Sequence, residues 1–391
     1  MKTRSTLTLL AVCLFAPVIF SACSKSSTPA PGPGTGPGPG PGAGPAKLQF
    51  KGTAQLSQAR IGLMAAATGT RFLFAGGRPG LANSDVVDIY DASGNTWSAA
   101  RLKDTREEHA AVAAGNKILV AGGSAFYSGK NVIAGVEIYD VTTGAWTFEQ
   151  LRVPIRNLSA AGIQNKIFIA GGVVLDKDSG CCVVTKEVNI YDVSTGKWSY
   201  EVLSEARRDI GLGAAGSKVV FAGGQGHSNV SGGYFADKVD IYDLAAKTWS
   251  TARLSEARDH LQAVAAGNFI FFIGGRISNF SATPWSKKID VYEVTTNKWS
   301  TLEMSEDRED FAVAAIGDKI VIAGGYSNAK AAYLKSVEVY DIPSGKWEKL
   351  ELSIARSKLA AAAAGKKLLI GGGFEELAGF SKTVDIFELS Q

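Results

Sequence analysis

The feature that most constrains this chain is a repeat of about 46 to 52 residues that runs from Lys47 to Gln391. A glycine pair ends an apolar run in every unit, and the first glycines of these pairs are Gly76, Gly122, Gly171, Gly223, Gly274, Gly324 and Gly372. In six units a tyrosine follows, with a tryptophan seven residues later. Such regular spacing predicts an array of small equivalent units rather than one continuous core.

Each unit contains four short runs of strand-like composition, which in the second unit lie at 110–114, 117–121, 136–139 and 146–149. Tight turns such as Gly115-Asn116 and Thr143-Gly144 separate them, because glycine tolerates positive backbone dihedrals. Helical periodicity is absent. Four-stranded units that repeat at about 50 residues predict an all-β fold, the β-propeller. The order Gly-Gly, Tyr, Trp resembles the kelch repeat over residues 47–391, which implies a kelch-type propeller.

The two ends of the repeat region predict how the ring closes. The seventh unit stops at Leu389 without its tryptophan strand, whereas residues 53–60 align with the stretch 251–258 of a later unit. Residues 47–56 are therefore an orphan fourth strand. We expect this strand to complete the last blade, which removes an exposed sheet edge and gives seven blades in total.

The N-terminal segment has the pattern of an export signal. Residues 1–22 combine the charged start of Lys2 and Arg4 with an apolar stretch and small residues before Cys23. The ending Phe20-Ser21-Ala22-Cys23 resembles the lipobox of bacterial lipoproteins, although leucine is usual where Phe20 stands. The resemblance implies acylation of Cys23 and a place in the bacterial cell envelope, with the outer membrane favoured. A plain signal peptide with a coincidental cysteine is the alternative.

The next segment, residues 23–46, is predicted to be a linker. Seven of the twelve prolines lie here, mostly alternating with glycine, so the segment cannot bury a core and acts as a semi-flexible spacer. Beyond the signal, the chain has no apolar run of the ~18 to 20 residues that a membrane helix needs. Membrane contact is therefore expected through the lipid anchor only. With 41 Lys and Arg against 37 Asp and Glu, the charge balance argues against nucleic acid as a partner.

Two charged columns repeat with the units and are expected to form a scaffold. An arginine lies sixteen residues before the glycine pair in six units, with Arg156 at fifteen in the third. An acid lies two residues before each aromatic residue, except that the third unit has Asn189. A charge that recurs in every blade is more simply explained by ion pairing than by a sevenfold active site.

Function is expected where the units differ, on the face that carries the long loops after each glycine pair and the residues after each arginine. Aromatic rings in these loops suit a sugar face or a protein hot spot. The binding residues predicted on this face are His109, Tyr127, Asp209, Tyr234, Phe235, His260 and Trp285. No metal and no cofactor are expected, because His109 and His260 lie at different offsets from their arginines and the ligands of a metal site must converge.

Cys181 and Cys182 are adjacent, and they remain after Cys13 leaves with the signal and Cys23 is acylated. In an oxidising setting they could form a vicinal disulfide, bridge two chains or stay reduced. All three states remain open from the sequence.

Three classes of function fit these observations. The favoured one is a lipid-anchored binding module for a glycan or a protein, acting through the long-loop face. The second is a carbohydrate-active enzyme, since the chain also resembles periplasmic kelch proteins that interconvert sialic-acid anomers. Such proton transfer needs an acid and a base, for which Glu107, His109, Asp209 and His260 are candidates. The third is a purely structural envelope protein, and on balance we do not expect an enzyme.

Overall fold

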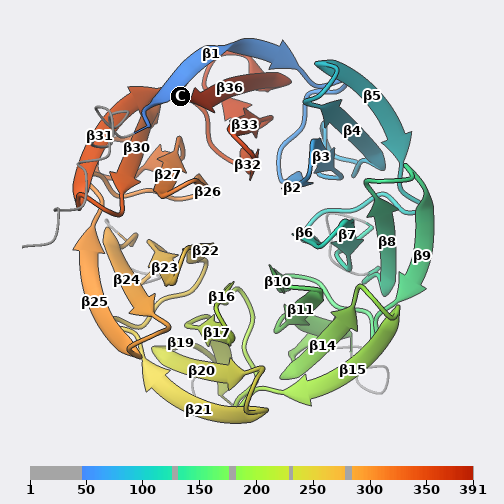
Figure 1. Ribbon diagram of the computed structural model, residues 1–391, viewed down its shortest axis with the longest axis vertical. Helices are drawn as coiled ribbons and strands as arrows, with labels where there is room; N and C mark the ends of the chain where they lie inside the picture. The colour runs from blue at the N-terminus through green and yellow to red at the C-terminus, as the bar shows by residue number, and fades with distance from the viewer. Residues whose placement is uncertain (1–45, 126–130, 176–181, 229–231, 278–283, 391) are drawn as a thin grey trace, which may run out of the picture. The chain divides into compact units, whose positions relative to one another are not determined.

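The computed structural model describes residues 46–125, 131–175, 182–228, 232–277 and 284–390, all within one compact unit, Pro45–Gln391. Throughout these residues the regular elements are strands, which form seven four-stranded and four two-stranded sheets. Figure 1 shows the seven larger sheets as blades around a central axis. The predicted seven-bladed all-β propeller is confirmed. In the described ranges no helix has the length and apolar character needed to cross a membrane. The predicted signal, Cys23 and most of the linker lie outside the described residues.

The first four blades follow one another along the chain. Blade 1 consists of β2 (Met64–Thr68), β3 (Arg71–Ala75), β4 (Val86–Asp91) and β5 (Thr96–Arg101). Blade 2 consists of β6 (Ala110–Ala114), β7 (Lys117–Ala121), β8 (Gly135–Asp140) and β9 (Trp146–Gln150). Blade 3 consists of β10 (Ser159–Ile163), β11 (Lys166–Ala170), β14 (Glu187–Asp192) and β15 (Lys197–Val202). Blade 4 consists of β16 (Gly211–Ala215), β17 (Lys218–Ala222), β20 (Lys238–Asp243) and β21 (Thr248–Arg253).

The last three blades and four hairpins complete the domain. Blade 5 consists of β22 (Gln262–Ala266), β23 (Phe269–Ile273), β24 (Lys288–Glu293) and β25 (Lys298–Glu303). Blade 6 consists of β26 (Ala312–Ile316), β27 (Lys319–Ala323), β30 (Ser336–Asp341) and β31 (Lys346–Glu351). Blade 7 consists of β32 (Ala360–Ala364), β33 (Lys367–Gly371), β36 (Thr383–Leu389) and β1 (Leu48–Gln55). The hairpins are β12 (Val173–Leu175) with β13 (Cys182–Val184), β18 (Gln225–Ser228) with β19 (Gly232–Phe235), β28 (Tyr326–Ser327) with β29 (Ala332–Tyr333), and β34 (Phe374–Glu375) with β35 (Gly379–Phe380).

The predicted closing strand is present and pairs as expected. β1 lies antiparallel to β36, from Leu48 opposite Leu389 to Gln55 opposite Thr383. The rings of Phe50 and Phe387 meet edge to face across this pair, with centroids 5.5 Å apart. The unit thus contains its own ring closure and all of its hydrophobic cores, so it can be produced by itself.

The cores lie between neighbouring blades, because each sheet is covered on both faces. The second strand of each blade is therefore almost wholly buried and apolar, as in Ile118 to Ala121 of β7. The repeated aromatic residues pair across the third and fourth strands of their own blade. Tyr139 faces Trp146 in this way, with ring centroids 5.0 Å apart. Their packing role explains why both recur at fixed spacing.

The arginine column forms the expected buried ion pairs in six blades. Arg106 is fully buried, and its Nη2 donates to both carboxylate oxygens of Glu137 at 2.9 and 2.8 Å. Its Nη1 donates to the carbonyls of Gly122 and Gly135. Glu137 in turn accepts from the backbone N–H of Lys103 at 3.0 Å. This pair thus links the segment after β5 of blade 1 to blade 2.

Blade 3 departs from this scheme, and the assignment of Arg156 to the arginine column is wrong. Ile155, which is fully buried, takes the arginine place sixteen residues before Gly171. Opposite it, Asn189 is fully buried, and its side-chain oxygen and nitrogen have no hydrogen-bond partner among the described residues. Blade 3 has therefore exchanged an ion pair for an isoleucine and an asparagine, which leaves Arg156 free to point elsewhere.

The propeller has two different faces. The mouth face carries the loops after the glycine pairs and the segments after the arginine column, which meet in short bridges such as Ile61 with Arg78. The turn face carries the tight turns between the first and second and between the third and fourth strands. Lys47 lies at the turn face, because its N–H donates to Ser390 Oγ and the neighbouring Leu389 N–H donates to Lys366 O in a turn.

Candidate functional site

One residue of each blade forms a ring at the mouth of the central channel, which we call the mouth ring. All seven members have a left-handed backbone, with φ between 51° and 62°, and they are Gly62, Glu108, Asn157, Asp209, His260, Asp310 and Lys358. Only one is glycine, although L-residues disfavour this conformation and Asn, Asp and His tolerate it best. Strained backbone of this kind collects at functional sites, where surrounding contacts enforce it.

Backbone hydrogen bonds between neighbouring blades hold the mouth ring in place. The N–H of Asn157 donates to Glu108 O at 3.0 Å, and that of Lys358 donates to Asp310 O at 2.7 Å. His260 N–H likewise donates to Asp209 O at 3.0 Å. Because the ring backbone is fixed, the side chains can vary from blade to blade without disturbing the fold.

All members of the mouth ring line a central cavity of about 480 Å³. Its deeper walls come from the innermost strands, for example Ala110 and Ala111 of β6. A cavity of this size is within the range of pockets that hold small molecules, ~300 to 1,000 Å³. The cavity is thus polar and varied at its mouth and built from small apolar side chains below.

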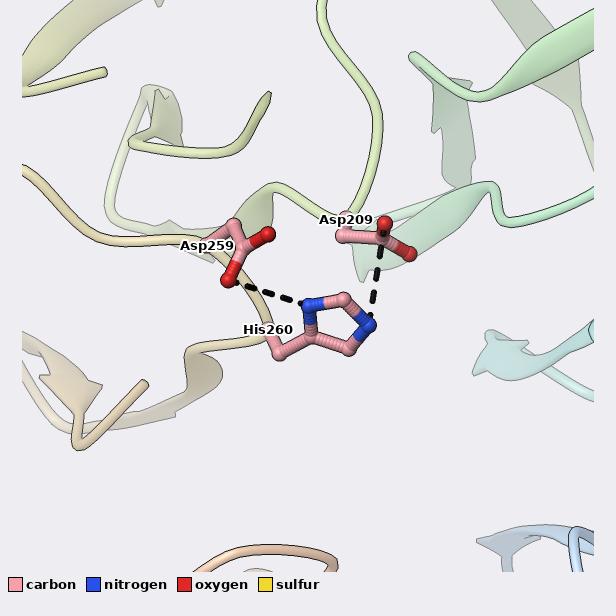
Figure 2. Close-up of side chains that lie close together, drawn as sticks. All are labelled: Asp209, Asp259 and His260. Atoms are coloured by element: carbon pink, nitrogen blue, oxygen red, sulfur yellow. Dashed lines mark ion pairs between the residues drawn. The ribbon is translucent and has the colours of Figure 1, made fainter. Parts of the chain in front are cut away.

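Three residues from blades 4 and 5 cluster at one side of this mouth. Figure 2 shows the imidazole of His260 between two carboxylates. Its Nδ1 lies 3.1 Å from Asp259 Oδ1 and its Nε2 lies 3.7 Å from Asp209 Oδ2. The His260 side chain is 41% exposed, whereas those of Asp209 and Asp259 are 8% and 0% exposed. His260 is therefore the member of this cluster that a ligand can reach.

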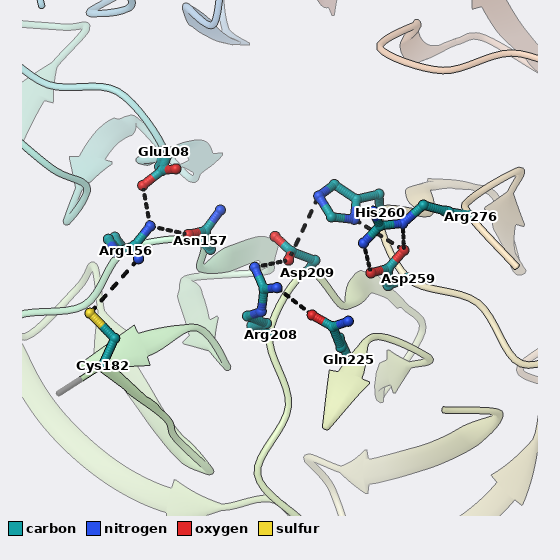
Figure 3. A network of polar contacts seen from close by, with 10 residues as sticks. All are labelled: Glu108, Arg156, Asn157, Cys182, Arg208, Asp209, Gln225, Asp259, His260 and Arg276. Atoms are coloured by element: carbon teal, nitrogen blue, oxygen red, sulfur yellow. Dashed lines mark hydrogen bonds and ion pairs between the residues drawn. The ribbon is translucent and has the colours of Figure 1, made fainter. Parts of the chain in front are cut away.

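Two arginines flank the cluster (Figure 3). Arg276 donates to both oxygens of Asp259, from Nε at 3.1 Å and from Nη2 at 2.7 Å. On the other side Arg208 donates to Asp209 Oδ2 at 3.0 Å and to the side chain of Gln225. The result is a continuous chain of alternating charges across two blades, with the imidazole at its centre.

This arrangement favours a protonated imidazole. Burial by itself would lower the pKa of His260, but the hydrogen bond to Asp259 and the charges of both carboxylates outweigh it, so the pKa is raised above 6.5. Burial raises the pKa of Asp209 against the opposing charges of His260 and Arg208. The imidazolium therefore stabilises the fold at acid to neutral pH, and this contribution is lost as the pH rises through the raised pKa of His260.

The same three residues have ligand atoms within 4.8 Å of one another, a separation that a metal ion could bridge. A metal requires deprotonated carboxylates and a neutral imidazole. Here Arg276 already holds both oxygens of Asp259, Arg208 holds Asp209, and the raised pKa of His260 favours the proton. This donor set fits a proton-bearing hydrogen-bond network and does not fit a metal.

His109 was predicted at the mouth, and the structure places it elsewhere. Its side chain is fully buried, and Nε2 lies 3.1 Å from the carbonyl of Ala75 in the neighbouring blade. Burial and the nearby Arg106 lower the pKa of His109 to about 3, so the ring is neutral. In the other six blades this position holds Leu63, Leu158, Ile210, Leu261, Phe311 and Leu359. His109 thus lies beside the cavity, but its imidazole is fully buried in an apolar packing position and is not exposed at the mouth as an acid or base.

We expect His109→Leu to leave the fold intact and to improve stability in acid. A histidine whose folded pKa is depressed must take up a proton on unfolding, so its contribution to stability falls as the pH drops from about 6.5 towards 3. Leucine removes that proton uptake. Urea unfolding at a series of acid pH values measures the effect. A variant that loses stability as steeply as the parent below pH 6 would show that other groups dominate.

The remaining predicted residues gather on the same side as His260. Trp285 lines the cavity and meets His260 edge to face, with ring centroids 6.5 Å apart. The Phe235 ring lies under the guanidinium of Arg276, 5.5 Å away. Tyr234 is 37% exposed on the adjacent hairpin strand β19. Asp209, His260, Trp285, Phe235 and Tyr234 thus form one sector across blades 4 and 5. Tyr127 lies outside the described residues.

A second polar group lies beside this sector, in blades 2 and 3 (Figure 3). Arg156, which sequence placed in the scaffold, donates to Glu108 Oε2 at 2.8 Å and to Asn157 Oδ1 at 3.0 Å. Its other terminal nitrogen lies 3.9 Å from the sulfur of Cys182, which is exposed. Cys181 lies outside the described residues, so the pairing of the two cysteines stays a prediction.

Sequence reasoning named the acidic residues of the mouth but did not include Asn157, Arg276 and Lys358 among the candidates. The available signal for Asn157 and Lys358 was their shared place fourteen residues before the first glycine of each pair, where four of the seven blades have Asn, Asp or His. Arg276 lies two residues after the first glycine of its pair, where the other blades have Arg, Ser, Val, Gln, Tyr and Phe. Only the bridge between Asp259 and Arg276 reveals its role.

Comparison with known proteins agrees with the fold. A family model described as the Attractin/LZTR1 beta-propeller matches residues 71–327 and, in an overlapping alignment, residues 154–379. The matched stretches cover nearly all of the seven blades. No curated protein matches the chain.

Proposed function

The chain belongs to the Attractin/LZTR1 β-propeller family, and from this premise we propose that its propeller is the binding module of a lipid-anchored protein of the bacterial cell envelope. The ligand is a glycan or a protein, and the mouth face receives it. The module needs no cofactor and does not act on nucleic acid.

The observation that carries this proposal is the contrast between repeated and variable charges. The repeated arginines are fully buried and bonded to their own blades. At the mouth ring, by contrast, the seven blades present six different residue types around an open cavity. A sevenfold scaffold that supports an asymmetric polar rim is suited to recognise one asymmetric ligand.

The sector across blades 4 and 5 supplies the chemistry for recognition. His260 donates and Asp209 accepts within 3.7 Å of each other, which matches a hydroxyl group that does both. Trp285 provides an aromatic wall beside them. Planar polar groups next to an aromatic ring suit a sugar, and the same combination serves as a hot spot for a protein loop.

Binding of purified residues 47–391 to glycan and protein arrays tests the proposal. We expect selective, saturable binding that Trp285→Ala weakens at least tenfold, since central aromatic anchors contribute roughly 2 kcal/mol or more. Tyr200→Ala is the matched control, because this tyrosine is also exposed but lies on the outer strand β15. A folded domain that binds nothing on either array would instead support the purely structural role.

The enzyme remains a second candidate because of one observation. Asp209 and His260 both have raised pKa values and face each other at the cavity, as an acid and base pair would. A sugar mutarotation assay decides this point. Turnover that His260→Gln abolishes would establish catalysis, whereas binding without turnover supports the module.

The lipid anchor is tested separately. Metabolic labelling with a fatty acid should mark the full chain and should fail in Cys23→Ser. Labelling that persists in this variant would contradict acylation at Cys23.

A further inference from the structure

The turn face carries a surplus of positive charge. Its turns and the adjoining strand ends hold twelve cationic side chains, namely Lys47, Arg71, Lys117, Lys166, Lys197, Lys218, Lys247, Lys298, Lys319, Lys346, Lys366 and Lys367. They hold eight anionic ones, namely Asp91, Asp140, Asp192, Asp243, Glu293, Asp318, Asp341 and Glu388. The other side chains between residues 47 and 391 have an excess of three negative charges. The domain is therefore electrically polarised along its axis.

Part of this charge is neutralised inside six of the seven blades. A cation at the start of the second strand pairs with an acid at the end of the third, as Lys117 pairs with Asp140 at 2.7 Å and Lys218 pairs with Asp243 at 2.6 Å. The surplus comes from lysines outside this pattern. Six exposed lysines have no carboxylate partner among the described residues, and they are Lys47, Lys197, Lys247, Lys298, Lys346 and Lys366.

These six lysines are distributed over blades 3 to 7 rather than gathered in one pocket. Five of them lie at or just before the first residue of an outer strand, as Lys197 does in β15 and Lys346 does in β31. They therefore occupy corresponding places at the turn-face ends of the outer strands. A broad, shallow array of this kind fits an extended anionic surface better than a single small anion.

The same face is where the linker enters the folded domain. Lys47 precedes β1 and is bonded to Ser390, beside the turn that contains Lys366. An anchor at Cys23 would thus pull on the turn face, and the mouth face lies at the opposite end of every blade.

We propose that the turn face docks on an anionic phospholipid surface, which leaves the mouth open to the opposite side. The positive charge of the turn face attracts it to the anionic lipids, and the linker holds the domain near the membrane. The orientation in the cell rests on the proposed anchor at Cys23, but the attraction itself belongs to the folded domain. Docking would keep the mouth accessible to ligands that arrive from the side away from the membrane.

Vesicle flotation with non-acylated residues 47–391 tests this proposal. We expect binding to vesicles of phosphatidylcholine mixed with phosphatidylglycerol, none to phosphatidylcholine alone, and release by high salt. Each lysine near an anionic leaflet strengthens partitioning about fivefold. The combined variant Lys197→Gln, Lys247→Gln and Lys346→Gln should therefore bind at least roughly tenfold more weakly.

The matched control changes the same number of exposed lysines at the mouth end of the third strands, namely Lys186→Gln, Lys287→Gln and Lys382→Gln. It alters the net charge equally and should bind like the parent. Equal losses of vesicle binding in both variants would show that only the net charge matters and would overturn the proposal. Absence of binding to anionic vesicles would overturn it as well.

Lysine acetylation of the unmodified domain on vesicles gives a second measure that needs no variant. Bound vesicles should reduce the acetylation of Lys197, Lys247 and Lys346. The acetylation of Lys186, Lys287 and Lys382 should not change. Protection of the second set would place the mouth on the membrane and contradict the orientation. The glycan and protein arrays measure binding at the mouth face independently of the vesicles. A domain that docks on vesicles but binds nothing on the arrays would contradict the proposed function and leave the docking proposal intact.

Discussion

Removal of residues 47–56 should abolish the folded monomer. β1 is the outermost strand of blade 7, and it joins that sheet through its antiparallel pairing with β36. Without it, β36 becomes an open edge whose unpaired N–H and C=O groups invite pairing between chains. Size-exclusion chromatography with light scattering should show aggregates or higher oligomers in place of the monomer.

The side chains of this segment add to the stability that is lost with the backbone hydrogen bonds of the strand. Leu48 and Leu56 are almost fully buried in two different cores, and Phe50 packs on Phe387. Buried leucines such as Leu48 and Leu56 contribute ~2 to 5 kcal/mol each when removed from a core. Together they equal a large share of the ~5 to 15 kcal/mol by which domains are stable.

A circular permutant separates the role of the strand from that of the chain end. In this permutant, residues 47–56 follow Gln391 through a short glycine linker. Every residue is kept, and only the point at which the strand is attached to the chain changes. We expect a folded monomer with a thermal midpoint near that of the parent. A truncated chain that remains monomeric with an unchanged midpoint would show that the ring does not need its closing strand.

The fold was predictable because its determinants repeat. Gly-Gly, Tyr and Trp each occupy a position where only a few residue types fit, so the glycine pair displays its constraint seven times and the Tyr and Trp display theirs six times. The fixed seven-residue step from Tyr139 to Trp146 corresponds to two facing residues on adjacent strands. Even the closing strand was visible, since 53–60 aligned with a complete unit.

The site was less predictable because its residues do not repeat and its contacts cross between blades. The pairing of His260 with Asp209 joins two units that are 51 residues apart. His109 lies one residue after the ring position held by Glu108, and this step turns its side chain from the cavity into the core. Arg156 was misassigned for the same reason, since a shift of one residue separates a buried scaffold position from the mouth.

Arg60→Ile should destabilise the domain by about 3 to 5 kcal/mol, the usual cost of leaving one partner of a buried pair without the other. Arg60 is fully buried, and its guanidinium bonds to Asp88 and to the carbonyls of Gly76 and Val86. Asp88 is itself buried and would be left with only its bond from the N–H of Ser57 at 2.8 Å. Urea unfolding measures the loss of free energy of unfolding, provided that the parent and the variant show the same dependence of that free energy on urea concentration.

Blade 3 supplies the control for this prediction, because it already contains the paired replacement. There Ile155 and Asn189 stand where other blades have arginine and an acid, and the blade keeps its four strands. The double variant Arg60→Ile with Asp88→Asn copies that solution into blade 1. Since it removes both charges, it should recover at least about 2 kcal/mol of the loss, in line with other buried pairs replaced as a unit. A double variant as unstable as Arg60→Ile would show that arginine packing and its bonds to the carbonyls, rather than the unpaired carboxylate, account for the loss. Recovery would explain how one blade of a charged ring can lose its ion pair and release a neighbouring arginine to the mouth.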